Sequence, residues 1–250
     1  MTLAARVLFL MLFVCAVVAC RGSSGIEPLP ATSKAPGWHE GILTHDGLER
    51  AFRVYVPEGL VDSAAAPADS ARVVMLLHGG TQSMDAIFRP RAGGTQEWRH
   101  VADDENLLLL VPNGVNPKTG SPTGDHQVWN DCRKLTTDDV TRSTADDVGF
   151  LMQLTQWAAS RFPVDPERLT VTGASNGGQM AYRLAIERPD QVAAIASFIA
   201  NLPAESECAV PTVPVPVLMV NGTDDPLMPY EGGSTGGRGT FYSAPATRKI

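Results

Sequence analysis

Residues 173–177, Gly-Ala-Ser-Asn-Gly, are the part of the chain best suited to chemistry. They match the Gly-x-Ser-x-Gly pattern, in which a sharp turn between a strand and a helix exposes a serine hydroxyl. A strand-like run over 168–172 precedes the turn and a helix-like run over 178–185 follows it, so Ser175 is predicted to be a nucleophile rather than part of a glycine-rich helix cap. A serine hydroxyl attacks only when a base takes its proton, which predicts a histidine and an acid elsewhere.

A second turn, His-Gly-Gly-Thr over 78–81, follows another apolar run. In a site of this kind the loop after that strand donates one backbone N–H to the oxyanion, and the residue after the nucleophile donates the other. The predicted donors are therefore Asn176 and either Gly80 or Thr81. His78 stands before the turn and is expected to shape the loop by hydrogen bonding rather than to transfer protons.

The acid is predicted in the segment Asn-Gly-Thr-Asp-Asp-Pro over 221–226, directly after an apolar run. A carboxylate just past a late strand has the position of the triad acid in the chain order Ser, Asp, His. Its role would be to orient the imidazole and to stabilise it when charged. Asp224 and Asp225 both fit, and either could instead be a turn residue favoured before a proline.

No histidine follows the predicted acid. The five histidines all precede Ser175: they are His39, His45, His78, His100 and His126. We expect the catalytic histidine to lie beyond residue 250. Two alternatives stay open, namely a degenerate hydrolase that binds without cutting, and a base supplied by His126 from the long polar loop over 116–144.

The predicted fold class is α/β, specifically an α/β-hydrolase with a mostly parallel central sheet and helices on both faces. Five short apolar runs end in turn signals, as strands buried in a parallel sheet do. These runs cover 73–77, 107–111, 169–172, 193–200 and 217–220. Helical patterns over 95–105 and 146–161 lie between them, and an Asp-Gly pair within 41–56 predicts a hairpin. Asp146 or Asp147 is expected to cap the longer helix. The last strand and helix of the sheet are expected to be missing, which would leave an apolar edge.

Residues 1–19 are predicted to be a lipoprotein signal peptide, because Arg6 precedes an apolar run too short for a comfortable membrane span. The run ends in Val-Val-Ala-Cys, which makes Cys20 the candidate acylated N-terminus; an ordinary cleaved signal peptide is the alternative. A flexible tether over 20–37 would lead to a hydrolase domain over 38–250. The formal net charge of −7 argues against nucleic acid or an anionic membrane surface as a partner.

Cys132 and Cys208 are the cysteines that remain after the leader and the lipid site. In an exported protein, two such cysteines predict a disulfide more readily than two free thiols. Two cysteines alone do not make a metal site, and no metal is expected.

Four segments, over 77–82, 146–150, 171–180 and 221–230, carry a family resemblance. Together they resemble the secreted polyhydroxyalkanoate depolymerase and feruloyl esterase group of the α/β-hydrolases, across roughly 41–233. The resemblance implies a serine esterase without metal or organic cofactor. It also assigns the acid to Asp225, the second of the aspartate pair, and implies a histidine in a Gly-His-like segment further downstream.

The expected function is that of an exported serine esterase, lipid-anchored or secreted, that forms an acyl-enzyme on Ser175. Its substrate would be a feruloyl or acetyl ester of a polysaccharide, or a hydroxyalkanoate polymer. Trp129 could stack on such a substrate at the cleft rim, or could anchor the long loop in the core. The alternatives are a non-catalytic surface lipoprotein that binds such polymers and a serine peptidase of the same fold.

Overall fold

The computed structural model describes residues 35–61, 71–90, 94–134, 142–235 and 239–247. The predicted signal peptide, Cys20 and most of the predicted tether lie outside these ranges. Within them, no helix is both long enough and apolar enough to cross a membrane.

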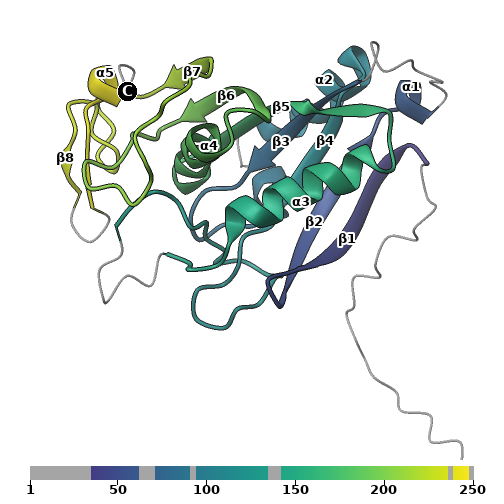
Figure 1. The fold of residues 1–250 in the computed structure, drawn as a ribbon, viewed down its shortest axis with the longest axis horizontal. Coiled ribbons are helices and arrows are strands. Elements are labelled where there is room, and N and C mark those ends of the chain that lie inside the picture. The colour runs from purple at the N-terminus through teal and green to yellow at the C-terminus, as the bar shows by residue number, and fades with distance from the viewer. Residues whose placement is uncertain (1–34, 62–70, 91–93, 135–141, 236–238, 248–250) are drawn as a thin grey trace, which may run out of the picture.

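A seven-stranded sheet forms the centre of the molecule, in the order β1-β2-β4-β3-β5-β6-β7 (Figure 1). The strands β1 and β2 pair antiparallel, as do β2 and β4, whereas the pairs from β4 through β7 are parallel. The strands are β1 Gly37–His45, β2 Leu48–Val56, β3 Ala71–Leu77, β4 Leu108–Pro112, β5 Val164–Ala174, β6 Val192–Phe198 and β7 Val217–Val220. The five apolar runs are thus β3 to β7, and the mostly parallel sheet is confirmed.

Helices lie on both faces of this sheet. The helices α3 (Asp147–Ala159) and α4 (Asn176–Glu187) cross in front of the strands in Figure 1, whereas α2 (Trp98–Glu105) packs on the other face. The short elements are α1 Glu58–Val61, the 3-10 turns Ala86–Phe88 and Gly94–Glu97, the ribbon of β8 Gly233–Ser234 with β9 Thr240–Phe241, and α5 Ala244–Thr247. The predicted helix over 95–105 is therefore a 3-10 turn followed by α2.

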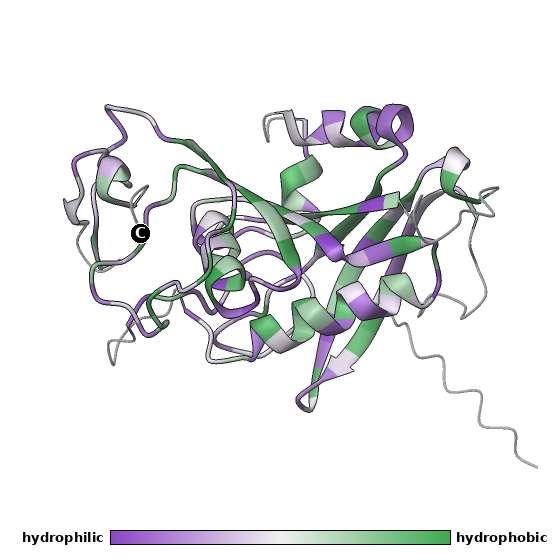
Figure 2. Ribbon diagram, turned by 45° about the horizontal axis from the view of Figure 1, so that its top comes forward, coloured by the Kyte–Doolittle hydropathy of each residue, from purple (hydrophilic) through white to green (hydrophobic). Residues whose placement is uncertain are grey.

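The alternation of side chains along the strands builds a core on each face. In β3, Val73, Met75 and Leu77 belong to the larger cluster, which α3 and α4 cover, and Val74 and Leu76 belong to the smaller cluster under α2. Figure 2 shows the resulting hydrophobic colour along the central strands. Because β3 to β7 run parallel, their carboxyl ends lie at the same edge of the sheet, where the loops that follow them meet.

The predicted hairpin also forms. The β1–β2 hairpin turns at Asp46 and Gly47, both with positive φ (48° and 74°), which is the conformation that an Asp-Gly pair adopts in a tight hairpin. At the other side of the sheet, β7 is the edge strand among the described residues. Its Val217, Leu218 and Val220 are 44%, 58% and 45% exposed.

Candidate active site

Ser175 stands on the turn between β5 and α4, as predicted. Its backbone has φ 54° and ψ −123°, a conformation that a residue with a side chain adopts only when its surroundings enforce it. The glycines beside it provide those surroundings. A Cβ on Gly173 would lie 2.6 Å from the backbone of Gly177, and a Cβ on Gly177 would lie 2.4 Å from the carbonyl oxygen of Leu77. The turn therefore packs directly on the end of β3, which fixes the serine at the sheet edge.

One pocket, with a volume of about 310 Å³, gathers the predicted catalytic groups. It is lined by Ser175, Asp225 and the three predicted oxyanion residues, together with Arg133, Gln179, Ile199, Leu227, Met228 and Phe241. Ser175 and Asp225 come from the ends of β5 and β7, fifty residues apart in sequence, so only the fold brings them together. The exposed Asp224 does not line this pocket.

The structure separates the two oxyanion candidates of the first loop. The N–H of Thr81 donates to the carbonyl oxygen of Gln127 at 2.8 Å, so it is already engaged, and the expectation that Thr81 supplies a donor is wrong for this conformation. The N–H of Gly80 makes no hydrogen bond to any part of the chain that the structure describes. Gly80 and Asn176 are therefore the pair of donors that the pocket offers.

Asn176 is held by the long loop. Its Oδ1 accepts from the N–H of Trp129 at 2.7 Å, and its Nδ2 donates to the carbonyl oxygen of Trp129 at 3.1 Å and to the carboxylate of Asp131 at 2.6 Å. All three groups are buried. These bonds fix the first residue of α4, and with it the backbone N–H that is predicted to donate to an oxyanion.

Trp129 is not at the rim. Its side chain is completely buried, its Nε1 donates to the carbonyl oxygen of His78 at 2.9 Å, and its ring lies 4.7 Å from the His78 ring. A buried ring cannot stack on a polymer at the surface, so the rim role proposed for Trp129 is wrong and its role is that of a loop anchor.

His78 shapes the loop before Gly80, as expected. Burial disfavours the imidazolium and lowers the pKa of His78 to about 4. Its Nδ1 donates to the carbonyl oxygen of Gly79 at 2.8 Å, and its Nε2 accepts from the N–H of Gly114 at 3.0 Å. Both ring nitrogens are thus engaged with backbone, which leaves neither for proton transfer with a substrate.

Asp225 lines the pocket and is held by hydrogen bonds at one carboxylate oxygen. Its Oδ1 accepts from the N–H groups of Leu227 at 2.8 Å and Met228 at 2.9 Å. Its Oδ2 receives no hydrogen bond from the described residues. A carboxylate held at one oxygen and open at the other can orient an imidazole N–H, which is the task of a triad acid.

No histidine lines the pocket among the residues that the structure describes. His45 bonds Asp146 and Gln153 at the N-terminus of α3, and His100 is exposed on α2. His126 is exposed in the long loop and has a φ of 73°. The structure therefore brings together the predicted nucleophile, the predicted acid and two backbone N–H groups, and it leaves the base unassigned.

A disulfide joins Cys132 and Cys208, which have a Cα–Cα distance of 5.2 Å, and so confirms the predicted pairing. In the chain, Cys132 stands between Asp131 and Arg133, two residues that the sequence analysis did not identify as part of the site. The Nε of Arg133 donates to both oxygens of the fully buried Asp131, at 3.0 and 2.9 Å. The disulfide thus fixes the segment over 131–133, in which Asp131 bonds Asn176 and Arg133 lines the pocket.

The Asp146–Asp147 pair has the structural role that the sequence suggested. Asp146 caps α3 by accepting from the N–H of Gly149 at 2.9 Å. Asp147 is buried, forms an ion pair with the buried Arg50, and accepts from the N–H of Asn130 at 2.6 Å. The pair therefore ties the long loop to the start of α3.

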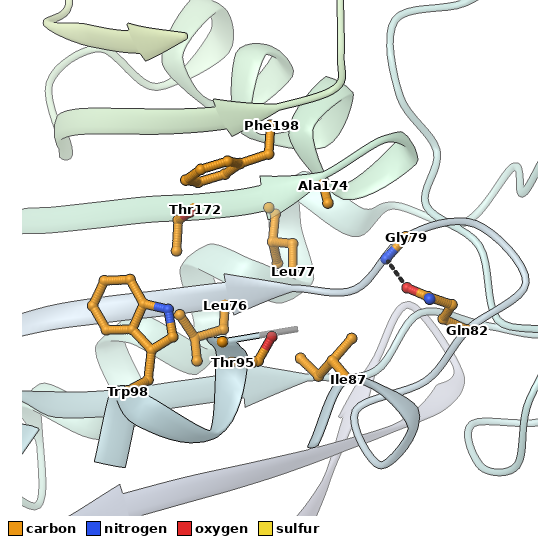
Figure 3. Close-up of a pocket in the computed structure, with 12 residues that line it drawn as sticks. Leu76, Leu77, Gly79, Gln82, Ile87, Thr95, Trp98, Thr172, Ala174 and Phe198 are labelled. Carbon is orange, nitrogen blue, oxygen red and sulfur yellow. Dashed lines mark hydrogen bonds between the residues drawn. The ribbon is translucent and has the colours of Figure 1, made fainter. Parts of the chain in front are cut away.

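A second cavity, with a volume of about 430 Å³, lies at the ends of β3 and β5 on the face of α2. In Figure 3, Trp98, Ile87, Leu77 and Phe198 surround it, and the Gly79 N–H donates to the Gln82 side chain at 3.0 Å. None of its lining residues is ionisable. Chemistry is therefore assigned to the smaller pocket around Ser175. Within the described ranges, no group of three His, Cys, Asp or Glu residues could hold a metal ion.

Comparison with known proteins agrees with this geometry. The model of the dienelactone hydrolase family matches residues 113–235. The chain is 30% identical over 218 residues to a putative esterase, NocK, from Nocardia uniformis subsp. tsuyamanensis, covering 87% of this chain and 57% of the relative. It is 26% identical over 208 residues to a poly(3-hydroxybutyrate) depolymerase from Ralstonia pickettii, covering 79% of this chain and 40% of the relative. The chain thus spans about half the length of these relatives.

Solved structures share the fold. The crystal structure of a thermostable esterase superposes with a TM-score of 0.53 at 17% identity, covering 78% of this chain and 48% of the other. The name of the second relative confirms the resemblance drawn from the four sequence segments. The sheet order, the strained serine between β5 and α4 and the superposition on a solved esterase together show that the chain has the α/β-hydrolase fold.

Proposed function

We propose that the protein is an exported serine esterase. The Ser175 hydroxyl attacks the carbonyl carbon of a carboxylic ester and loses its proton to an imidazole that Asp225 orients. The resulting oxyanion is held by the N–H groups of Gly80 and Asn176. The ester C–O bond then breaks, the alcohol leaves with the proton, and water releases the acid from the acyl-enzyme by the same steps.

One observation carries this proposal: the pocket of about 310 Å³ holds Ser175, Asp225 and two unengaged backbone donors together. The names of the two relatives, an esterase and a polyester depolymerase, favour ester over amide substrates. The substrate proposed here is accordingly a carboxylic ester, either a feruloyl or acetyl ester of a polysaccharide or a hydroxyalkanoate polymer.

No described lining residue of the pocket is a histidine, so the general base has to come from another segment. We propose that an imidazole from a segment beyond residue 250, as the family resemblance implies, reaches the oxygen of Asp225 that accepts no hydrogen bond from the described residues. The lack of a histidine among the described lining residues also favours the rival function, which is a non-catalytic lipoprotein that binds esters. Tests of catalysis therefore include imidazole in the buffer, so that a missing base does not conceal a working nucleophile.

The reaction class can be tested with p-nitrophenyl acetate and p-nitroacetanilide, at equal concentration and with imidazole present. We expect release of p-nitrophenol that depends on Ser175, and no release of p-nitroaniline, since an anilide has the poorer leaving group. Ser175→Ala is the control for both substrates. Cleavage of ester and anilide alike would instead indicate a peptidase, and the absence of Ser175-dependent release would favour the non-catalytic alternative.

We also propose that the protein is anchored through Cys20 after removal of residues 1–19. The disulfide supports export, because such bonds form in oxidising compartments. Mass spectrometry of protein expressed with its own leader should find a lipid-modified N-terminal peptide that begins at Cys20. Cys20→Ala should remove the lipid and release the protein from the membrane fraction. An unmodified N-terminus at another residue would contradict the anchor and leave ordinary secretion.

A further inference from the structure

Two kinds of side chain line the pocket around Ser175. Four of the lining residues are apolar: Ile199, Leu227, Met228 and Phe241. Apart from the predicted catalytic and oxyanion residues, Arg133 and Gln179 supply the polar side chains. A ligand that fills this pocket therefore meets both hydrocarbon and polar groups.

The charge of Arg133 is balanced within the protein. Its guanidinium contacts the carboxylate of Asp131, and the Nη2–Oδ2 distance is 2.9 Å. Asp131 is completely buried, and the side chain of Arg133 is 8% exposed. Because a buried carboxylate already neutralises this cation, Arg133 gives the pocket no net charge with which to recruit an anionic ligand.

Gln179 differs because its side chain is not satisfied inside the protein. It is 3% exposed, and its Nε2 has no hydrogen-bond partner among the described residues. A buried amide left without a partner costs about 1–3 kcal/mol, a cost that a ligand oxygen can remove. Rotation about the last torsion exchanges the amide oxygen and nitrogen, so the group can donate to a carbonyl oxygen or bond a hydroxyl in either sense.

The position of Gln179 relates it to the reacting atoms. Its backbone N–H donates to the carbonyl oxygen of Ser175 at 2.9 Å, so Gln179 lies one helical turn after the nucleophile. Side chains with that spacing are about 5–6 Å apart at Cβ. An oxygen that reaches Gln179 while the ester carbonyl lies at Ser175 is therefore close to the carbonyl carbon.

We propose that Gln179 is a specificity-determining residue that binds an oxygen substituent, hydroxyl or carbonyl, carried by the substrate close to the scissile ester. This inference rests on the proposed function, because it treats the bound ester as a substrate. Its central claim is a binding preference. The apolar lining residues contact the hydrocarbon part of the same group. A plain alkyl ester would fill the pocket and leave the Gln179 amide without a partner, so the protein binds it less tightly.

Binding of two amides that the enzyme is not expected to cleave tests this claim without any need for turnover. The probes are 3-hydroxybutyramide and 3-methylbutyramide, which have nearly the same shape and differ by a hydroxyl in place of a methyl group. NMR titration should show about five- to tenfold tighter binding of the hydroxy amide to the unaltered chain. Gln179→Met, which keeps the length of the side chain without its polar atoms, should lose this preference.

Three further variants complete the test. Ser175→Ala should keep the preference, and Leu227→Ala, which changes an apolar lining residue, should weaken the binding of both amides alike. Gln179→Leu is the substitute if Gln179→Met does not fold, as judged by its melting temperature. Equal binding of both amides to the unaltered chain, or a preference that survives loss of the glutamine, would overturn the inference. A preference that holds while Ser175-dependent hydrolysis is absent would sustain the Gln179 site and refute the esterase.

Discussion

Added imidazole should raise the Ser175-dependent hydrolysis of p-nitrophenyl acetate by the 250-residue chain about 10- to 100-fold. A positioned general base contributes roughly 10²–10⁴-fold to such reactions, and a freely diffusing imidazole recovers part of this. Without a base, only the enhancement from the oxyanion hole and binding remains, about 10³–10⁴ over water in other serine hydrolases. The measurement is the initial rate against imidazole concentration, after subtraction of the rate with Ser175→Ala, because imidazole itself cleaves this ester.

The aspartate pair provides a matched control for this rescue. Asp225→Asn should reduce the imidazole-dependent rate several-fold, since a neutral amide neither holds the imidazole in the correct tautomer nor stabilises its charged form as a carboxylate does. Asp224→Asn should leave the rate unchanged, because Asp224 does not line the pocket. A rate without imidazole that is already high, and that His126→Ala abolishes, would show that the long loop supplies the base. Equal rates for the unaltered chain and Ser175→Ala would refute Ser175 as nucleophile.

The sequence predicted those parts of the site that depend on local backbone. The turn at Ser175 needs small residues before and after it and a strand and helix on its two sides, and all of these are contiguous in the chain. The sheet followed in the same way, because runs buried on both faces are continuously apolar. The disulfide was predictable for a different reason, since only Cys132 and Cys208 were left to pair outside the leader.

The parts that sequence reasoning missed depend on contacts between distant segments. Thr81 looked as suitable a donor as Gly80 until the bridge between Gln82 and Gln127 brought an acceptor to its N–H. Trp129 could not be placed, since a tryptophan in a polar loop serves equally well as an anchor or as a stacking surface. Gln179 was hidden because nothing in a helical sequence marks an amide whose partner is absent.

Asp147→Asn should destabilise the protein by about 3–5 kcal/mol, although Asp147 takes no part in the chemistry. The side chains of Arg50 and Asp147 are 1% and 0% exposed and form an ion pair between β2 and the start of α3. Removing one charge leaves the other buried without compensation, which costs far more than the pair contributes when intact. Urea denaturation should report the loss as a lower midpoint with an unchanged slope.

The neighbouring aspartate is the control for this prediction. The side chain of Asp146 is 51% exposed, and asparagine caps a helix about as well as aspartate, so Asp146→Asn should cost less than about 1 kcal/mol. The double variant Arg50→Met with Asp147→Leu removes both charges and should be more stable than Asp147→Asn, since no buried charge then lacks a partner. Equal losses for Asp146→Asn and Asp147→Asn would mean that the buried ion pair between β2 and α3 contributes no more to stability than the exposed cap. The two losses should differ because the two adjacent residues have different environments. Asp146 is exposed to solvent, whereas Asp147 contacts the guanidinium of Arg50, which is 97 residues away in sequence and is brought close by the fold.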